Sequence, residues 1–312
     1  MNIVFFGSAK FSVPSLDALV KSGHTVSCVV TQPDRRQGRG LQLTPTPVKA
    51  HALLCGLRVY QPERINTQDA LKFLLETKAD LFVVIAYGQI LSSSVLSIPL
   101  VFCLNVHASL LPLYRGAAPI NWAIIRGEKV TGITTIKMVR EMDAGPIILQ
   151  RQIEIAEEDT VLTLEEKMAQ QSAQVLLESL KAIETKQFGL IPQDESRVSF
   201  APKLKKEDGL IDWQKKSTDI CSLVKGCLDW PVAFTYYKGK LLKIYAARCQ
   251  EQKACPDTAS PGEIIEVSSD NIALATGKGI ILIEKVQLEA RRAMSAREFL
   301  AGHKITPGET LG

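Results

Sequence analysis

Asn105 and His107 are separated by one residue and follow directly after the apolar run Val101 to Leu104. Such a run predicts a buried strand, and alternate side chains of a strand point to the same face. An amide and an imidazole at the carboxyl edge of a parallel sheet could stabilise an oxyanion and transfer a proton. A single histidine at a strand end is more often structural, so the surrounding residues must decide between these two interpretations.

Asp143 is the carboxylate expected to join this pair. It is followed closely by a Gly-Pro pair, and an acid in that setting is typical of a turn. Because this turn comes just before a predicted strand, Asp143 can lie at the sheet edge near His107. A carboxylate there would orient the imidazole and favour its charged form.

Short apolar runs alternate with helical patterns over the first half of the chain. This alternation is typical of a parallel sheet covered by helices. Strands are expected at residues 3–6, 24–31, 57–60, 81–85, 101–106, 132–139 and 146–155. Helices are expected between Pro14 and Gly23, and at residues 48–55, 69–77, 120–126 and 163–186.

The pattern changes near residue 200. Prolines and mixed charges without periodicity predict a linker over residues 189–206. Beyond it, a helix at 217–226 is followed by several short strands between glycine-containing turns, which predicts a small barrel or sandwich. The expected organisation is a first domain over residues 1–188, a linker over 189–206 and a second domain over 207–312.

Composition and charge restrict the class of protein. A chain of 312 residues, 46% of them hydrophobic, has an ordinary globular composition and room for two domains. The net charge of +4 is too small to indicate nucleic acid by itself. The seven cysteines form no Cys-x-x-Cys pair, which predicts reduced thiols in the cytoplasm and neither a disulfide framework nor a zinc site. No segment has the length of a membrane span, and the apolar start is too short for a signal peptide.

Positive charge gathers at two places that could hold a nucleic-acid backbone. The polar segment from Gln32 to Pro47 carries Arg35, Arg36 and Arg39. We expect a long loop there, either a solvated excursion or an arm that becomes ordered on an RNA backbone. The weaker second cluster, in the predicted linker, consists of Lys203, Lys205 and Lys206.

The turn after the first predicted strand, Gly7-Ser-Ala-Lys10, lacks both the Gly-x-Gly-x-x-Gly pattern and a Walker-type lysine pattern. It is interpreted as a simple strand-to-helix turn, so no nucleotide cofactor is expected.

The motif around the polar pair resembles a known family. Asn105-x-His107, Ser109-Leu-Leu-Pro112, Arg115-Gly-Ala-Ala-Pro-Ile120 and Asp143 are together similar to the formyltransferases that use 10-formyltetrahydrofolate. The similarity extends over essentially the whole chain and includes Thr44-Pro-Thr-Pro-Val-Lys49, Phe200-Ala-Pro-Lys203 and Ile211-Asp-Trp213. The turn Gly7-Ser-Ala-Lys-Phe11 departs from the family, which more often has Gly-Thr-Pro, an acid and Phe.

The resemblance implies an α/β fold, with a Rossmann-like formyltransferase domain followed by a carboxyl-terminal OB-like β-barrel domain. It also implies an activity. The formyl group of 10-formyltetrahydrofolate would pass to the amino group of methionyl initiator tRNA, without a metal, in a cytoplasmic monomer that binds no membrane. The catalytic residues would be Asn105, His107 and Asp143. The folate-binding residues would be Ser109, Leu110, Leu111 and Pro112. The tRNA-binding residues would be Arg36, Arg39, Lys203, Lys205 and Lys206.

Other functions are compatible with parts of this pattern. The nearest is a sister activity on the same domain, either formyl transfer to an amino sugar or a glycinamide nucleotide, or hydrolysis of formyl-folate. The arginines of the 32–47 segment and the second domain favour a larger acceptor. A non-catalytic RNA-binding protein would leave Asn105, His107 and Asp143 without a purpose. A nicotinamide oxidoreductase lacks its glycine motif.

Overall fold

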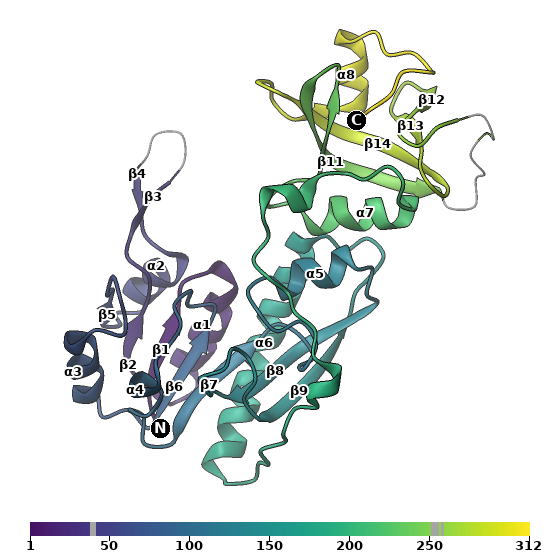
Figure 1. Ribbon diagram of the computed structural model, residues 1–312. Helices are drawn as coiled ribbons and strands as arrows, with labels where there is room; N and C mark the ends of the chain where they lie inside the picture. Colours follow the sequence, from purple (N-terminus) through teal and green to yellow (C-terminus); the bar gives the residue numbers. More distant parts are fainter. Residues whose placement is uncertain (38–41, 251–255, 257–258) are drawn as a thin grey trace. The chain divides into compact units, whose positions relative to one another are not determined.

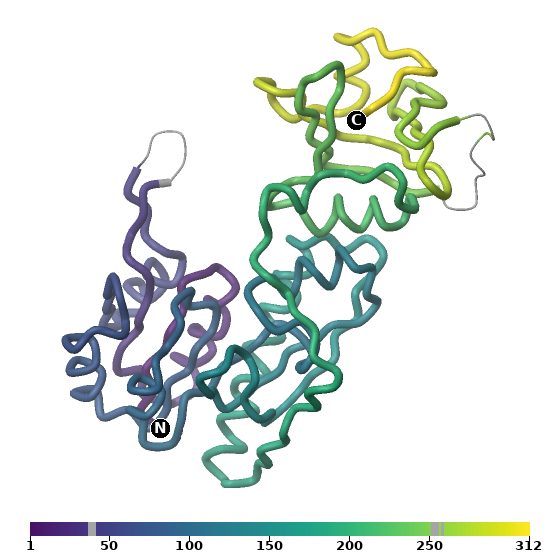
Figure 2. Tube along the Cα trace, in the orientation of Figure 1, coloured from purple at the N-terminus to yellow at the C-terminus, as the bar shows by residue number. Residues whose placement is uncertain are grey.

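The computed structural model describes residues 1–37, 42–250, 256 and 259–312, and the chain divides into two compact units. The first unit contains Met1–Pro119, Val130–Glu154 and Glu165–Ala201. The second contains Ile120–Lys129, Ile155–Leu164 and Pro202–Gly312. The second unit therefore includes two short segments that precede residue 165 as well as the carboxyl-terminal part (Figures 1 and 2).

A seven-stranded sheet forms the centre of the first unit, in the order β5-β2-β1-β6-β7-β8-β9. The strands are β1 (Asn2–Gly7), β2 (Thr25–Val30), β5 (Val59–Tyr60), β6 (Leu81–Ile85), β7 (Phe102–His107), β8 (Val130–Lys137) and β9 (Ile147–Glu154). The first five pair in parallel, as expected from the sequence, but β8 is antiparallel to both β7 and β9. The expectation of a parallel sheet is therefore wrong for β8, which runs opposite to the other six strands of this sheet. Only residues 138–146 connect β8 to β9, and no helix crosses back there, so the chain must reverse.

Helices complete the first unit: α1 (Val13–Lys21), α2 (Pro47–Leu54), α3 (Gln68–Glu76), the single turn α4 (Ser93–Leu96) and the long α6 (Val161–Glu184). Threonine side chains cap the N-termini of α2 and α3. The Thr46 hydroxyl accepts from the Lys49 amide, and the Thr67 hydroxyl accepts from the Ala70 amide. One apolar core lies around Phe6, whose ring contacts those of Phe82 and Tyr87, with centroids 5.1 and 5.4 Å away.

The described part of the segment from Gln32 to Pro47 contains more regular structure than the sequence suggested. It contains a two-stranded ribbon, β3 (Arg35–Gln37) with β4 (Gln42–Thr44), where the sequence predicted only a loop. Three-residue strands with Leu43 as their single apolar residue carry no apolar alternation, so the pattern could not reveal them. At the base of the ribbon, Lys49 forms an ion pair of 2.7 Å with Asp34.

The second unit is built on an antiparallel six-stranded sheet. Five strands pair in the order β10-β11-β14-β13-β12, and β15 pairs with β14. The strands are β10 (Phe234–Tyr237), β11 (Lys240–Gln250), β12 (Ile264–Val267), β13 (Ile272–Ala275), β14 (Ile280–Leu288) and β15 (Met294–Ser295). Register shifts near Ala246 interrupt the pairing of β11 with β14, and irregularities of this kind bend a sheet. The expected small carboxyl-terminal β domain of OB-like type is confirmed.

Helices α5 (Pro119–Ile125), α7 (Ser217–Gly226) and α8 (Ala296–Gly302) accompany this sheet. The first two approach closely at Gly226, where an added Cβ would lie 2.6 Å from the Ile125 side chain. Asn121 fixes the contact because its Nδ2 donates to the Gly226 carbonyl at 2.9 Å. In the described part of the chain, no helix is both long and apolar enough to cross a membrane.

Candidate active site

The site is assembled at the carboxyl end of β7, between the parallel strand β6 and the antiparallel strand β8. Asn105 and His107 alternate on this strand, as the sequence predicted. Asn105 is partly accessible, whereas His107 is only 7% exposed. Residues 108–118 then form a loop that turns back over the strand end before α5 begins.

Asp143, in the connection between β8 and β9, contacts both residues of the pair. Its Oδ1 accepts a hydrogen bond of 3.2 Å from Asn105 Nδ2, and its Oδ2 accepts one of 2.9 Å from the Gly116 amide. The same Oδ2 lies 3.6 Å from His107 Nδ1, close enough for electrostatic attraction but beyond a normal hydrogen bond. The structure therefore brings the three sequence-predicted polar residues together.

His107 is oriented by a main-chain carbonyl. Its Nε2 lies 2.9 Å from the Tyr114 carbonyl oxygen, which can only accept, so Nε2 must carry a hydrogen. Tyr114 has φ of 61°, a left-handed backbone that is unusual for an aromatic residue and aims its carbonyl at the ring. Nδ1 is thus the imidazole nitrogen that faces Asp143 and the end of β7.

The loop from Ser109 to Pro112 is fixed by hydrogen bonds to the residue that follows it and to β8. The fully buried Ser109 hydroxyl donates to the Leu113 carbonyl at 2.6 Å, and the Leu111 amide donates to Thr134 Oγ1 at 3.1 Å. Leu111 also packs in a small apolar cluster with two isoleucines, Ile136 and Ile147. The Ser109 side chain is thus committed to the loop itself, while Leu110 is partly accessible.

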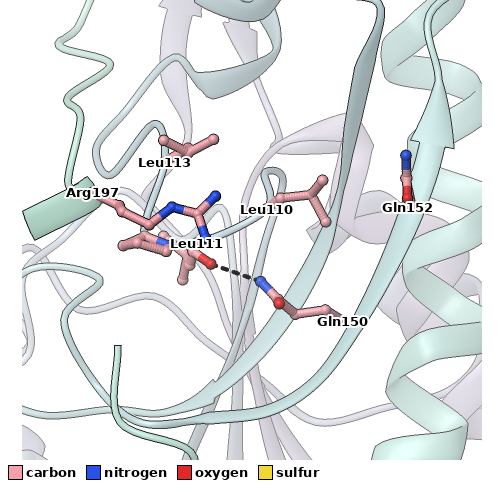
Figure 3. Close-up of a pocket in the computed structure, with 7 residues that line it drawn as sticks. Leu110, Leu111, Leu113, Gln150, Gln152 and Arg197 are labelled. Carbon is pink, nitrogen blue, oxygen red and sulfur yellow. Dashed lines mark hydrogen bonds between the residues drawn. The ribbon is translucent and has the colours of Figure 1, made fainter. Parts of the chain in front are cut away.

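A cavity of about 390 Å³ lies against this loop (Figure 3). Its walls are formed by Leu110, Leu111, Pro112, Leu113, Gln150, Gln152 and Arg197. Gln150 reaches across it from β9 and donates to the Leu111 carbonyl at 2.8 Å. The cavity includes three of the four residues expected to bind folate, but neither Ser109 nor the polar trio lines it.

Sequence patterns predict no role for Tyr114 or Gln193, and they include Arg115 only as part of a longer motif. Arg115 is 5% exposed, and its guanidinium donates to Gln193 Oε1. A buried guanidinium needs hydrogen-bonding partners. No pattern in the sequence identifies Gln193 as the partner of Arg115. Gln193 lies in the segment that the sequence suggested was a linker.

The residues expected to bind tRNA belong to both units. Arg36 is exposed on β3 of the first unit, whereas Arg39 lies outside the described residues. The exposed lysines Lys203, Lys205 and Lys206 belong to the second unit. Among the described residues, no three His, Cys, Asp or Glu side chains are grouped as a metal site would require.

Comparison with known proteins extends these observations to the whole chain. The formyl transferase family matches residues 1–180, and the formyl transferase C-terminal domain matches residues 203–304. The methionyl-tRNA formyltransferase of Acetivibrio thermocellus is 44% identical, and that of Alkaliphilus oremlandii is 42% identical. Both alignments cover 100% of this chain and 100% of the relative.

A solved structure with a similar fold is HypX from Aquifex aeolicus in complex with tetrahydrofolic acid. It has a TM-score of 0.63 and 19% sequence identity, and the match covers 96% of this chain and 46% of that one. At this identity the likeness concerns the fold alone. The family matches in both halves and the full-length identity above 40% agree with the polar trio at the end of β7, and the chain belongs to the formyl transferase family.

Proposed function

We propose that this protein transfers the formyl group of 10-formyltetrahydrofolate to the amino group of methionyl initiator tRNA. The observation that carries the proposal is the contact of Asn105, His107 and Asp143 at the carboxyl end of β7. The full-length relatives named methionyl-tRNA formyltransferase support the choice of acceptor.

The reaction needs donors for an oxyanion and a path for one proton. The methionyl amine attacks the formyl carbon, and the carbonyl electron pair moves to the formyl oxygen. Asn105 Nδ2 and His107 Nδ1 are the side-chain donors suited to that oxyanion, since His107 Nε2 is used by the Tyr114 carbonyl. When the intermediate collapses, the bond between the formyl carbon and folate N10 breaks, and N10 gains the proton that the amine loses.

Asp143 is suited to that proton transfer. Its carboxylate lies between the two donors and can accept the proton of the attacking amine before the departing nitrogen receives it. His107 donates through Nδ1 as the imidazolium, since Nε2 already carries the hydrogen that faces the Tyr114 carbonyl, and a charged donor stabilises an oxyanion more strongly than a neutral one.

Substrate binding is divided between the parts of the chain in this proposal. The loop from Ser109 to Pro112 contacts the folate through its main chain and leucine side chains. Residues 1–188 carry catalysis, and residues 207–312 help to hold the tRNA. The tRNA-binding cations are Arg36, Arg39, Lys203, Lys205 and Lys206.

A formylation assay with matched acceptors tests the proposal. The purified chain is given 10-formyltetrahydrofolate and either methionyl initiator tRNA or methionyl elongator tRNA, with an amino-sugar nucleotide as a third acceptor. We expect rapid formylation of the initiator tRNA and much slower reaction with the other two. Preferential use of the amino-sugar nucleotide, or formyl-folate hydrolysis without an acceptor, would contradict it.

The protein is further proposed to act as a cytoplasmic monomer. Light scattering during size-exclusion chromatography checks the second point, because a monomer has a mass of 34.3 kDa. A mass near twice that value would contradict it.

A further inference from the structure

We propose that Gln193 is a positioning residue that holds the Asp143 carboxylate in its catalytic place. The Gln193 side chain forms no hydrogen bond with the side chains of Asn105, His107 or Asp143. It binds main-chain carbonyls of the turn that carries the carboxylate, and its effect on turnover rests on the function proposed above.

The amide of Gln193 holds the turn that carries Asp143. Its Nε2 donates to the Asp143 carbonyl at 2.7 Å and to the Gly145 carbonyl at 2.8 Å. Asp143 has φ of 53°, so its backbone is in the left-handed region, which costs free energy unless surrounding contacts hold it. The two hydrogen bonds supply such contacts directly at the strained residue.

Arg115 fixes which way the Gln193 amide points. Its Nε and Nη2 donate to Gln193 Oε1 at 3.1 and 2.8 Å. A guanidinium has donors only, so the oxygen of the amide must face Arg115 and the nitrogen must face the two carbonyls. Both hydrogens and the oxygen of this amide are thereby used, and no flipped orientation satisfies the same partners.

These contacts close a ring through the site. The Gly116 amide donates to Asp143 Oδ2, and Gly116 follows Arg115 in the chain. Arg115 then binds Gln193, and Gln193 binds the Asp143 carbonyl. The side chain and the main chain of Asp143 are thus both tied to residues 115–116, which restricts the carboxylate to one position beside His107.

The segment that carries Gln193 has its own attachment to the site loop. The Arg115 amide donates to the Ser199 carbonyl at 2.9 Å, and the Ala201 amide donates to the Arg115 carbonyl at 2.8 Å. The Tyr114 amide also donates to Ser199 Oγ at 2.9 Å. Since these bonds do not involve the Gln193 side chain, its replacement should leave the segment attached and the protein folded.

Gln193→Glu is the discriminating variant because it is isosteric. A carboxylate still accepts from Arg115, but it cannot donate to the Asp143 and Gly145 carbonyls and repels both. We expect kcat for formylation to fall at least tenfold, with KM values for both substrates changing less than twofold, since displacement of a reacting group by about 1 Å can cost on the order of a hundredfold. Gln193→Ala removes the contacts without adding charge, and its kcat should also be lower than that of the wild type.

Glu195→Gln is the matched control. Glu195 also binds Arg115, at 2.7 Å, but it is exposed, and among the described residues it forms no hydrogen bond or ion pair with the turn of Asp143. Its amide variant keeps an acceptor for Arg115, so kcat should stay within twofold of the wild type. A loss as large as that of Gln193→Glu would place the effect at Arg115 and overturn the proposal.

A double-mutant cycle separates positioning from general damage. In an Asp143→Asn background the carboxylate is already lost, so Gln193→Glu should cost less than a further twofold in single-turnover rate. A full additional loss, or a lowered melting temperature that accounts for the effect, would overturn the assignment. Failure of the proposed function is distinguishable, because the wild type would then formylate no methionyl-tRNA at all.

Discussion

At the scale of single residues, one main-chain carbonyl gives the two ring nitrogens of His107 different roles. The Tyr114 carbonyl occupies Nε2 and fixes the plane of the ring, so Nδ1 is left to face the carboxylate of Asp143. Asn105 faces the same carboxylate from two residues earlier on the strand. These three contacts therefore orient the side chains on which the chemistry of the site depends.

Asn105→Ala and Asp143→Ala should each lower turnover on the order of a hundredfold or more, because each removes a group that acts on developing charge or on the transferred proton. The measurement is the single-turnover rate of formyl transfer, with circular dichroism and thermal unfolding as checks on folding. Asp194→Ala is the control, since that exposed carboxylate only caps the adjacent turn. Near-normal formylation by either site variant would refute its assignment.

At the scale of elements, the turn between β8 and β9 is packed without spare room. An added Cβ at Gly145 would lie 1.8 Å from the Lys137 carbonyl oxygen, so the two segments approach as closely as only glycine allows. Gly116 is similar, with φ of 124° and an added Cβ 2.6 Å from the Ala201 carbonyl oxygen. Both glycines lie beside the residues that hold Asp143, so the carboxylate depends on them.

Gly145→Ala should destabilise the protein by about 2 kcal/mol and lower formylation as well, since the turn carrying Asp143 must move away from β8. Denaturant unfolding and the formylation rate measure the two effects. Gly189→Ala is the matched control, because nothing lies within 4 Å of an added Cβ there. Equal stability of the two variants would show that the turn accommodates the methyl group.

The ribbon β3–β4 carries two exposed arginines and is held at its base by an ion pair. The ion pair between Asp34 and Lys49 joins its base to α2, and the hydrogen bond from Gln61 contributes most to holding the pKa of Asp34 below its usual value. Arg35 forms an ion pair with Glu63. Arg36 lies on the other side of the strand and is exposed.

Arg36→Ala should raise the KM for tRNA severalfold while leaving folate binding unchanged, because it removes one phosphate-binding cation from the ribbon. Its effect should shrink as salt is increased, since screening already weakens that contact. Arg35→Ala serves as the comparison, as its cation is engaged by Glu63. If the folate affinity of Arg36→Ala falls as much as its tRNA affinity, the ribbon is not a tRNA arm.

At the scale of the whole molecule, each unit has an apolar core of its own. Cys28 and Cys103 are buried in the core of the first unit, and Cys221 is buried in that of the second. Burial raises the pKa of the Cys28 thiol to about 11 and those of Cys103 and Cys221 to about 12. At pH 8 these thiols therefore hold less of the reactive thiolate than a free cysteine does.

Alkylation at pH 8, followed by peptide mapping, should label Cys55 in the native protein but not the buried thiols of Cys28, Cys103 and Cys221. In increasing denaturant, Cys28 and Cys103 should become reactive together, because they share one cooperative core. Cys221 reports on the other unit independently. Different midpoints for Cys28 and Cys103, or labelling of Cys221 without denaturant, would contradict two intact cores.

Much of the site could be anticipated because its chemistry is written locally. The two-residue spacing of Asn105 and His107 sets their common face as soon as β7 forms, and the apolar run before them predicts that strand. The position of Asp143 is harder to predict from sequence, since its distance from His107 depends on where β8 pairs with β7. The reversed direction of β8 could not be predicted, because an apolar run looks the same in either direction.

What the sequence determined by itself was the set of reactive groups, the alternation of strands and helices in the first unit, and the β-rich character of the second. These follow from side-chain chemistry and from periodicities that span a few residues. The tertiary structure alone decided which imidazole nitrogen is free, that residues 35–44 contain a ribbon, and that Gln193 reaches Asp143 across fifty positions of chain. Such contacts leave no local pattern, because their geometry is fixed only when distant segments pack against one another.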